Sequence, residues 1–139
     1  MANKNSIVIT SAGRTAVGSL GKSLKSVPGD TLGSVVISDA IKRSKIKKVD
    51  VDEVIMGQVL TGSTGQNPAR QASIKSGIPK EKPAYIVNQV CGSGIRSVAS
   101  GFQSIKAGDS KIIIAGGQES ISWATTWPEG SSLFSDLSS

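Results

Sequence analysis

Cys91 is the only cysteine in this chain and the residue best suited to covalent chemistry. Gly92, Ser93 and Gly94 follow it. A thiolate at the start of a helix is stabilised by the helix dipole and by backbone N–H groups. Glycines let a thioester approach the backbone closely, and their N–H groups can stabilise an oxyanion. The spacing therefore indicates an acyl-accepting thiol at Cys91.

The same residues allow an interpretation without chemistry. A lone cysteine is more often a small buried hydrophobic residue than a nucleophile, and glycines at a helix start also serve packing. The chain has no histidine, which excludes a Cys-His dyad within it and leaves no plausible zinc site. From spacing alone, the catalytic and the inert interpretation of Cys91 are about equally supported.

Alternating strands and helices are expected to position Cys91. Apolar runs predict strands at residues 6–10, 54–60, 83–90 and 111–117. Helical spacing and capping residues predict helices at residues 30–44, 67–77 and 93–107. The order β-α-β-α-β-α-β predicts an α/β fold with a mainly parallel sheet and helices on both faces. Cys91 would then lie at the carboxyl end of a strand, where ligands gather in such folds.

The predicted helix after Cys91 has an unusual composition. Its apolar stripe consists of Ile95, Val98, Ala99, Phe102 and Ile105. Most of the remaining positions are serine or glycine, whereas a surface helix usually carries a charged outer face. A helix of small and apolar residues all round is expected to be buried between two layers.

The composition is that of one soluble globular domain, with 37% hydrophobic and 19% charged residues among 139. No apolar run reaches the roughly 20 residues of a membrane span, and no secretory segment precedes the first predicted strand. A single cysteine fits a cytoplasmic or other reducing compartment, since it permits no internal disulfide.

The formal net charge is +6, and part of it is concentrated in one cluster. The cluster consists of Lys42, Arg43, Lys45, Lys47 and Lys48. It suits either a polyanion site or the solvated end of a helix, where cations complement the dipole. No aromatic residue interleaves the cluster, as a base-stacking surface would require, which favours the helix end and no nucleic-acid partner.

Four blocks of the sequence resemble the thiolase family, the acetyl-CoA C-acetyltransferases. Residues 88–98 resemble the nucleophile motif of the family, around Cys91-Gly-Ser-Gly. Residues 14–18 resemble its first loop, residues 57–72 its second strand, loop and helix, and residues 116–122 the motif after its fourth strand. The blocks occur in the order of the family and cover about residues 6–122.

The resemblance implies a thiolase-like N-terminal half in which Cys91 is the nucleophile. Cys91 would take an acyl group from acyl-CoA as a thioester, and its backbone N–H would contribute to an oxyanion hole. A second acetyl-CoA would be deprotonated and attack that thioester, giving acetoacetyl-CoA in a reversible Claisen condensation. Coenzyme A would enter as part of the substrate, so no separate cofactor and no metal are expected. Residues 57–72 resemble the biosynthetic, acetoacetyl-CoA branch.

The chain also departs from the family. Family members are more than twice as long, form homo-oligomers and consist of two similar halves. The second half supplies the activating histidine, a second cysteine and an asparagine-water site, and an inserted loop region supplies most CoA contacts. We therefore expect residues 1–121 to form a partial N-terminal domain and residues 122–139 an atypical tail, with Ile121 where methionine is common.

Two interpretations of this short chain follow. It is the nucleophile-bearing part of an acyltransferase that needs the missing C-terminal half, or a catalytically silent remnant that serves as an assembly partner. In either case, the helix at 93–107 loses the cover of the second half, and the final strand of this half is absent. The chain alone is expected to be marginally stable, to associate with itself and to lack activity.

Overall fold

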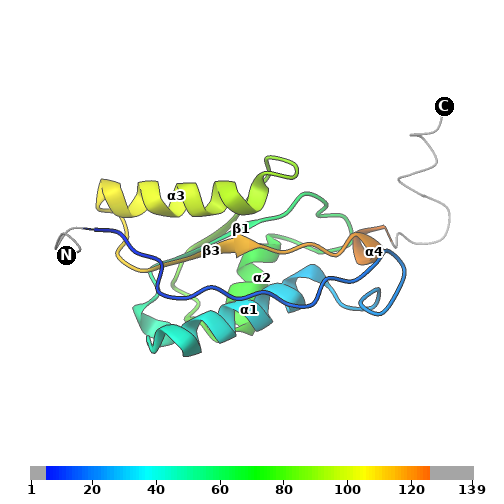
Figure 1. Ribbon diagram of the computed structural model, residues 1–139, viewed down its shortest axis with the longest axis horizontal. Helices are drawn as coiled ribbons and strands as arrows, with labels where there is room; N and C mark the ends of the chain where they lie inside the picture. Colours follow the sequence, from blue (N-terminus) through cyan, green and yellow to red (C-terminus); the bar gives the residue numbers. More distant parts are fainter. Residues whose placement is uncertain (1–5, 126–139) are drawn as a thin grey trace.

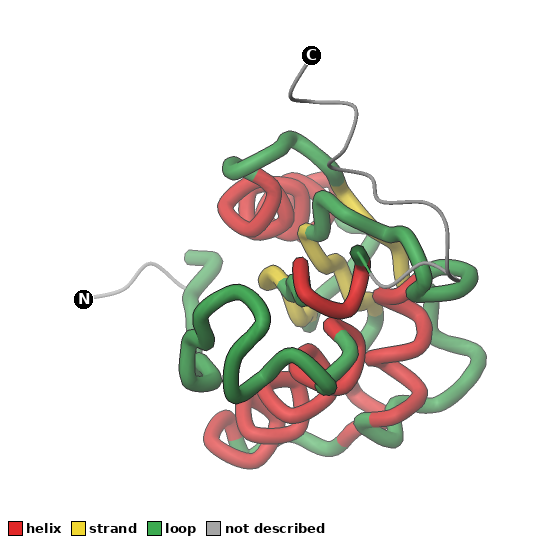
Figure 2. The backbone as a smooth tube through the Cα atoms, turned by 90° about the vertical axis from the view of Figure 1, so that its right-hand side faces the viewer, coloured by secondary structure: helices red, strands yellow, loops and turns green. Residues whose placement is uncertain are grey.

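The computed structural model describes residues 6–125, which form a three-stranded parallel sheet between two helical layers (Figure 1). The strands are β1 (Glu53–Gly57), β2 (Ala84–Val87) and β3 (Ile113–Gly117), in the order β2-β1-β3. The helices are α1 (Gly29–Ser44), α2 (Pro68–Lys75), α3 (Ser93–Ala107) and α4 (Ile121–Ala124), with a 3-10 turn η1 (Lys48–Asp50). Figure 2 shows α3 on one face of the sheet and helices on the other. The predicted α/β class, parallel sheet and two-sided helix packing are confirmed.

The predicted strand at residues 6–10 is wrong. These residues lie outside the sheet, and Val8 and Ile9 are 63% and 79% exposed. A cleft of about 330 Å³ separates the segment around Ile9 to Thr15 from β3 and α1. An apolar run becomes a strand only where a neighbouring backbone completes its hydrogen-bond ladder. This segment lies across the cleft from the edge of β3, so its backbone forms no hydrogen-bond ladder with that strand.

The main core lies between the sheet and the layer of α1 and α2. The cluster consists of Ile37, Ile41, Val51, Val54, Met56, Ala69, Ala72 and Ile78. Alternate residues of a strand point to opposite faces, so Val54 and Met56 of β1 face this layer together. The small Ala69 and Ala72 of α2 let α1 and α2 pack closely on one another beside β1. The core therefore holds β1 rigidly at the centre of the sheet.

Polar residues of the block at 57–72 tie α2 to β2. Asn67 caps α2 by accepting a hydrogen bond from the Arg70 backbone N–H at 3.1 Å, and its Nδ2 donates to the Ala84 carbonyl at 2.9 Å. The Arg70 guanidinium donates to the carbonyls of Lys80 and Lys82, at 2.7 Å to the latter. In this chain these residues set where β2 begins, and so where it ends before Cys91.

Helix α3 packs on the sheet through its small residues. Ser93, Ser97 and Gly101 are buried, and Ser97 Oγ donates to the Gly116 carbonyl of β3 at 2.7 Å. A Cβ atom added to Gly57 would lie 2.4 Å from the carbonyl carbon of Ser93, so only glycine fits at the end of β1. The small residues thus let the helix backbone approach the sheet closely.

The apolar stripe of α3 points away from the sheet. Ile95 is 75% exposed and Phe102 is 48% exposed, and Val98 lies on the same outer face. The expected burial of this helix between two layers is not seen in this chain, because only the small-residue face is covered and the apolar face is exposed. Burying a large apolar side chain fully stabilises by roughly 1.5–3 kcal/mol, so this uncovered face forgoes several kcal/mol.

The expected division of the chain at residue 121 stays a prediction. Helix α4 spans that position, and residues 126–139 lie outside the described part of the chain. Among the residues that the structure describes, no helix combines the length and apolar character needed to cross a lipid bilayer.

Asp52 fastens β3 to the start of β1. Its carboxylate accepts hydrogen bonds from the backbone N–H groups of Lys111 at 2.8 Å and Ile112 at 3.0 Å. Lys82 lies 3.8 Å away. The hydrogen bonds from Ile112 and Lys111, with a smaller contribution from the Lys82 charge, hold the pKa of the Asp52 carboxyl below its ordinary value.

The substitution Asp52→Asn is expected to lower the free energy of unfolding near neutral pH. A carboxyl whose folded-state pKa is depressed contributes stability that is fully present above its unfolded pKa of about 3.9 and lost as the pH falls through the folded-state pKa. The side chain is 36% exposed, so solvent screening limits the loss at pH 7 to about 1 kcal/mol or less. Urea unfolding at pH 7 and pH 3 measures it, with the exposed Glu81→Gln as control. An Asp52→Asn deficit that persists unchanged at pH 3 would contradict this account.

The exposed stripe of α3 is expected to drive self-association of the chain. Ile95→Ser combined with Phe102→Ser should lower the weight-average mass in sedimentation experiments across a concentration series. The cost in stability should be small at Ile95, which is 75% exposed, and about 1 kcal/mol at Phe102, which is 48% exposed. Gln103→Ser, on the same helix, serves as the control and should leave association unchanged. Equal association of the double variant and the parent chain would show that another surface is responsible.

Candidate active site

Cys91 lies in a tight turn between the end of β2 and the start of α3. The Gly92 N–H donates to the Gln89 carbonyl at 3.0 Å, and the Ser93 N–H donates to the Val90 carbonyl at 3.0 Å. The Ser93 hydroxyl also donates to the Val90 carbonyl, at 2.6 Å, and accepts the Gln89 N–H at 2.8 Å. Four hydrogen bonds of Gly92 and Ser93 thus close the turn around Cys91.

The residue before Cys91 has an unusual backbone conformation. Val90 has a φ of 49°, in the left-handed region that β-branched residues rarely adopt. Its side chain is 64% exposed, so packing of that side chain does not impose the conformation. The turn that presents Cys91 is therefore strained at Val90 and is held by its hydrogen bonds.

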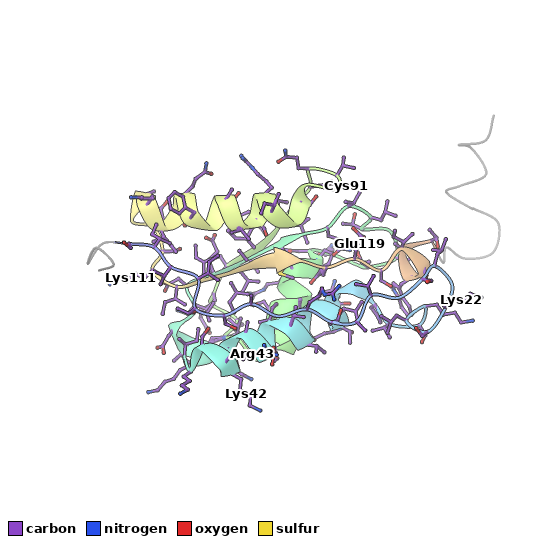
Figure 3. All side chains as sticks on the ribbon, in the orientation of Figure 1. Lys22, Lys42, Arg43, Cys91, Lys111 and Glu119 are labelled. Atoms are coloured by element: carbon purple, nitrogen blue, oxygen red, sulfur yellow. The ribbon has the colours of Figure 1, made fainter. Side chains whose placement is uncertain are left out.

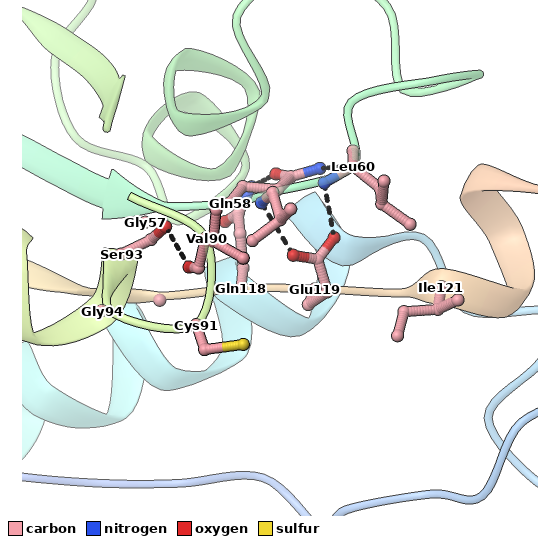
Figure 4. Close-up of a pocket in the computed structure, with 12 residues that line it drawn as sticks. Gly57, Gln58, Leu60, Val90, Cys91, Ser93, Gly94, Gln118, Glu119 and Ile121 are labelled. Carbon is pink, nitrogen blue, oxygen red and sulfur yellow. Dashed lines mark hydrogen bonds between the residues drawn. The ribbon is translucent and has the colours of Figure 1, made fainter. Parts of the chain in front are cut away.

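The Cys91 thiol is exposed and lines a pocket of about 540 Å³ (Figure 4). The walls come from the carboxyl ends of β1 and β3, from the turn before α3 and from the first residue of α4. The lining residues are Gly57, Gln58, Val59, Leu60, Val90, Cys91, Ser93, Gly94, Gly117, Gln118, Glu119 and Ile121. The expected position of Cys91, at the carboxyl edge of a parallel sheet, is the position that the structure gives.

Two buried glutamines form the floor of this pocket, and the sequence interpretation missed them. Gln118 Nε2 donates to Gln58 Oε1 at 2.9 Å, and Gln58 Nε2 donates to the Leu60 carbonyl at 2.9 Å. A signal for this pair was available, because a glycine-glutamine pair occurs within the predicted strand at 54–60 and again at the end of the predicted strand at 111–117. Gly57 and Gly117 are partners in the parallel register of β1 and β3, so the glutamines that follow meet side by side.

Glu119 also lines the pocket and was not predicted as a site residue. Its carboxylate accepts the backbone N–H of Val59 at 2.8 Å and that of Leu60 at 3.2 Å. Both oxygens are therefore occupied by the segment that leaves β1. This geometry makes Glu119 a brace for that segment.

The geometry limits what the site can do by itself. The Gly92 N–H, considered as an oxyanion donor from the sequence, donates to the Gln89 carbonyl at 3.0 Å in this structure, and its role at an oxyanion stays a prediction. The chain contains no histidine to act as the base for Cys91. Within residues 6–125, no cluster of three or more His, Cys, Asp or Glu side chains is arranged to hold a metal ion. The pocket presents an exposed thiol, and the chain supplies no histidine to activate it.

The basic cluster lies apart from this pocket. Figure 3 shows Cys91 beside the start of α3, whereas Lys42 and Arg43 lie on the opposite layer, at the end of α1. Arg43 pairs with Asp39 at 2.7 Å, one helical turn earlier. Cations in the last turn of α1 complement the helix dipole, so this part of the cluster has a structural explanation.

A family model and individual relatives both match this chain to thiolases. The family model for the N-terminal domain of thiolase matches residues 7–135. An acetyl-CoA acetyltransferase of Cupriavidus necator is 54% identical over 118 residues, which cover 85% of this chain and 30% of that protein. A cytosolic acetyl-CoA acetyltransferase of Rattus norvegicus is 47% identical over 123 residues, which cover 88% of this chain and 31% of that protein.

Solved structures of a thiolase and of an acetyl-CoA acetyltransferase also resemble this chain. The Acat5 thiolase of Ascaris suum in complex with coenzyme A superposes with a TM-score of 0.76 at 40% identity, covering 81% of this chain and 30% of that chain. The acetyl-CoA acetyltransferase of Bacillus anthracis gives 0.80 at 31% identity, covering 90% and 34%. The chain thus spans about a third of the length of these relatives, and it belongs to the thiolase family as part of the N-terminal domain.

Proposed function

We propose that this chain is the nucleophile-bearing part of an acyl-CoA acyltransferase of the thiolase type. The observation that supports it most is the placement of Cys91, the only thiol, on a strained turn inside a pocket at the carboxyl edge of the sheet. The relatives carry the name acetyl-CoA acetyltransferase, and one related structure is a complex with coenzyme A. The proposed substrate is acetyl-CoA.

The first half-reaction is acyl transfer to Cys91. The thiolate attacks the carbonyl carbon of acetyl-CoA, a new C–S bond forms, and the bond to the coenzyme A sulfur breaks. The proton lost by Cys91 is returned to the departing coenzyme A thiolate. In this proposal, the backbone N–H of Cys91 stabilises the oxyanion of the intermediate. The dipole of α3, whose first residue is Ser93, favours the thiolate.

The second half-reaction needs groups from outside this chain. A base removes a proton from the methyl group of a second acetyl-CoA, and the carbanion attacks the acetyl–Cys91 carbonyl. A C–C bond forms, the Cys91 sulfur leaves, and acetoacetyl-CoA is released. We propose that the part of the family fold beyond this chain supplies the base and covers the exposed stripe of α3. The assembled enzyme is proposed to be a homo-oligomer.

A second candidate function has a specific observation in its favour. The absence of histidine from the 139 residues favours a catalytically silent member of the family that serves as an assembly partner. The two candidates differ in one measurable step, which is whether Cys91 becomes acylated once the rest of the fold is present.

Reconstitution distinguishes these candidates. The 139-residue chain is co-expressed with the remaining C-terminal two-thirds of the Cupriavidus necator relative, and acetoacetyl-CoA thiolysis is measured. We expect activity, and an acetyl adduct on Cys91 by peptide mass spectrometry. Cys91→Ser should lower kcat by at least about a thousandfold, because a hydroxyl is a far weaker nucleophile without a strong base. A reconstituted protein without any Cys91 adduct would reject the acyltransferase proposal.

The chain alone is expected to show no thiolysis. Without a base to activate Cys91 or to deprotonate the second acetyl-CoA, neither half-reaction proceeds at an enzymatic rate. Coenzyme A-dependent cleavage of acetoacetyl-CoA by the purified 139-residue chain, at a rate above that of Cys91→Ser, would contradict this expectation. It would also reject the silent-partner candidate.

A further inference from the structure

The strained conformation of Val90 is held by two neighbouring side chains. Asn88 Oδ1 accepts the Val90 backbone N–H at 3.0 Å, and Ser93 Oγ donates to the Val90 carbonyl at 2.6 Å. Both polar backbone groups of Val90 are therefore bonded to side chains. A β-branched residue gains nothing intrinsically from a φ of 49°, so these two bonds hold the conformation together with the Ser93 backbone N–H, which also donates to the Val90 carbonyl at 3.0 Å.

Asn88 makes a second hydrogen bond, to another strand end. Its Nδ2 donates to the Val59 carbonyl at 3.1 Å, in the segment that leaves β1. The Val59 N–H is held from the other side by Glu119, at 2.8 Å, after the end of β3. The side chain of Asn88 thus connects the turn before Cys91 to a segment that Glu119 already braces. The carboxyl ends of the three strands are linked through Val59.

The chemistry of this position calls for an asparagine. One short side chain must accept a hydrogen bond at Oδ1 and donate one at Nδ2. Aspartate keeps the acceptor and loses the donor, and alanine loses both. Asn88 is itself exposed, so neither bond is explained by the need to satisfy a buried polar group. The two bonds instead fix the direction in which the turn presents Cys91.

We propose that Asn88 is a positioning residue, which holds the strained Val90 turn against the braced Val59 segment and thereby aims the Cys91 thiol into the pocket. This role rests on the proposed acyl transfer at Cys91. Acyl transfer depends on the placement of the nucleophile, since a displacement of about 1 Å can cost about a hundredfold in rate. Asn88 acts through Val90 and is not among the residues that line the pocket.

The single cysteine permits a direct test of this role in the 139-residue chain. A nitroxide spin label attached to Cys91 reports the mobility of the turn at that position alone. Asn88→Ala should shorten the rotational correlation time of the label by about twofold or more, because the turn then moves on the nanosecond timescale. Gln103→Ala, an exposed amide further along α3, is the matched control and should leave the spectrum unchanged.

A second variant keeps the test decisive. Asn88→Asp retains the acceptor for the Val90 N–H and loses the bond to the Val59 carbonyl, so its label mobility should lie between the parent and Asn88→Ala. Circular dichroism confirms that each variant is folded. If Asn88→Ala does not fold, Asn88→Asp decides the outcome. Label spectra of folded Asn88 variants that superimpose on the parent spectrum would overturn the proposal.

Kinetics of the reconstituted enzyme separate the positioning role from the proposed function. Asn88→Ala should lower kcat by about 10- to 100-fold while KM for acetoacetyl-CoA changes by less than about twofold. Absence of a Cys91 adduct in the parent enzyme would reject the acyltransferase proposal and leave the label result to decide the positioning of the turn. A parent enzyme that is active, with an unchanged kcat in Asn88→Ala, would overturn the role of Asn88.

Discussion

The close contact between the start of α3 and the carboxyl ends of β1 and β3 is the constraint on which the site depends. Gly57 lies against the Ser93 backbone so closely that no side chain fits, and a Cβ atom on Gly117 would lie 3.4 Å from the Gly94 Cα. Ser97 adds a hydrogen bond to the Gly116 carbonyl at 2.7 Å. Because the helix cannot move away from the sheet without losing these contacts, the turn before it is confined as well. Cys91 owes its position to that confinement.

The same contact explains why α3 carries its apolar residues on the outside. A helix that approaches a sheet through serine and glycine has little room for large side chains on that face. Its large side chains, Ile95 and Phe102 among them, therefore point away and remain uncovered. On the other face of the sheet, α1 and α2 form an ordinary apolar core with β1. The two layers therefore pack differently. Helix α3, which follows the candidate nucleophile Cys91, keeps large apolar side chains exposed on its outer face.

The pocket beside Cys91 is assembled mostly from backbone and braced by amides and one carboxylate. Gln118 donates a hydrogen bond to Gln58 beneath the pocket. The Glu119 carboxylate accepts hydrogen bonds from the backbone of the segment after β1. This arrangement fixes the strand ends around the thiol, but the chain contains no histidine to accept the proton of the thiol. The acyl transfer proposed for Cys91 therefore depends on groups from outside this chain.

The sequence by itself determined the parallel α/β class, the bounds of α3 and the location of Cys91 at a strand-to-helix turn. These follow from local signals, namely apolar runs, helical spacing and glycines at residues 92, 94 and 108. Tertiary structure alone decided three further points. Residues 6–10 have the composition of a strand, yet they lie outside the sheet because a cleft separates them from β3.

The second point is which face of α3 meets the sheet, and the third is which distant residues form hydrogen bonds with Asn88 and Glu119. Composition showed that α3 has an apolar stripe and a small-residue stripe, but only the glycine at position 57 and the Ser97 bond decide which stripe meets the sheet. The roles of Asn88 and Glu119 depend on Val59, which is 29 and 60 residues away in the chain. Contacts of that separation arise from strand register, and no local pattern of residue types encodes them. The sequence identified the thiol, whereas the packed strand ends determine how it is held.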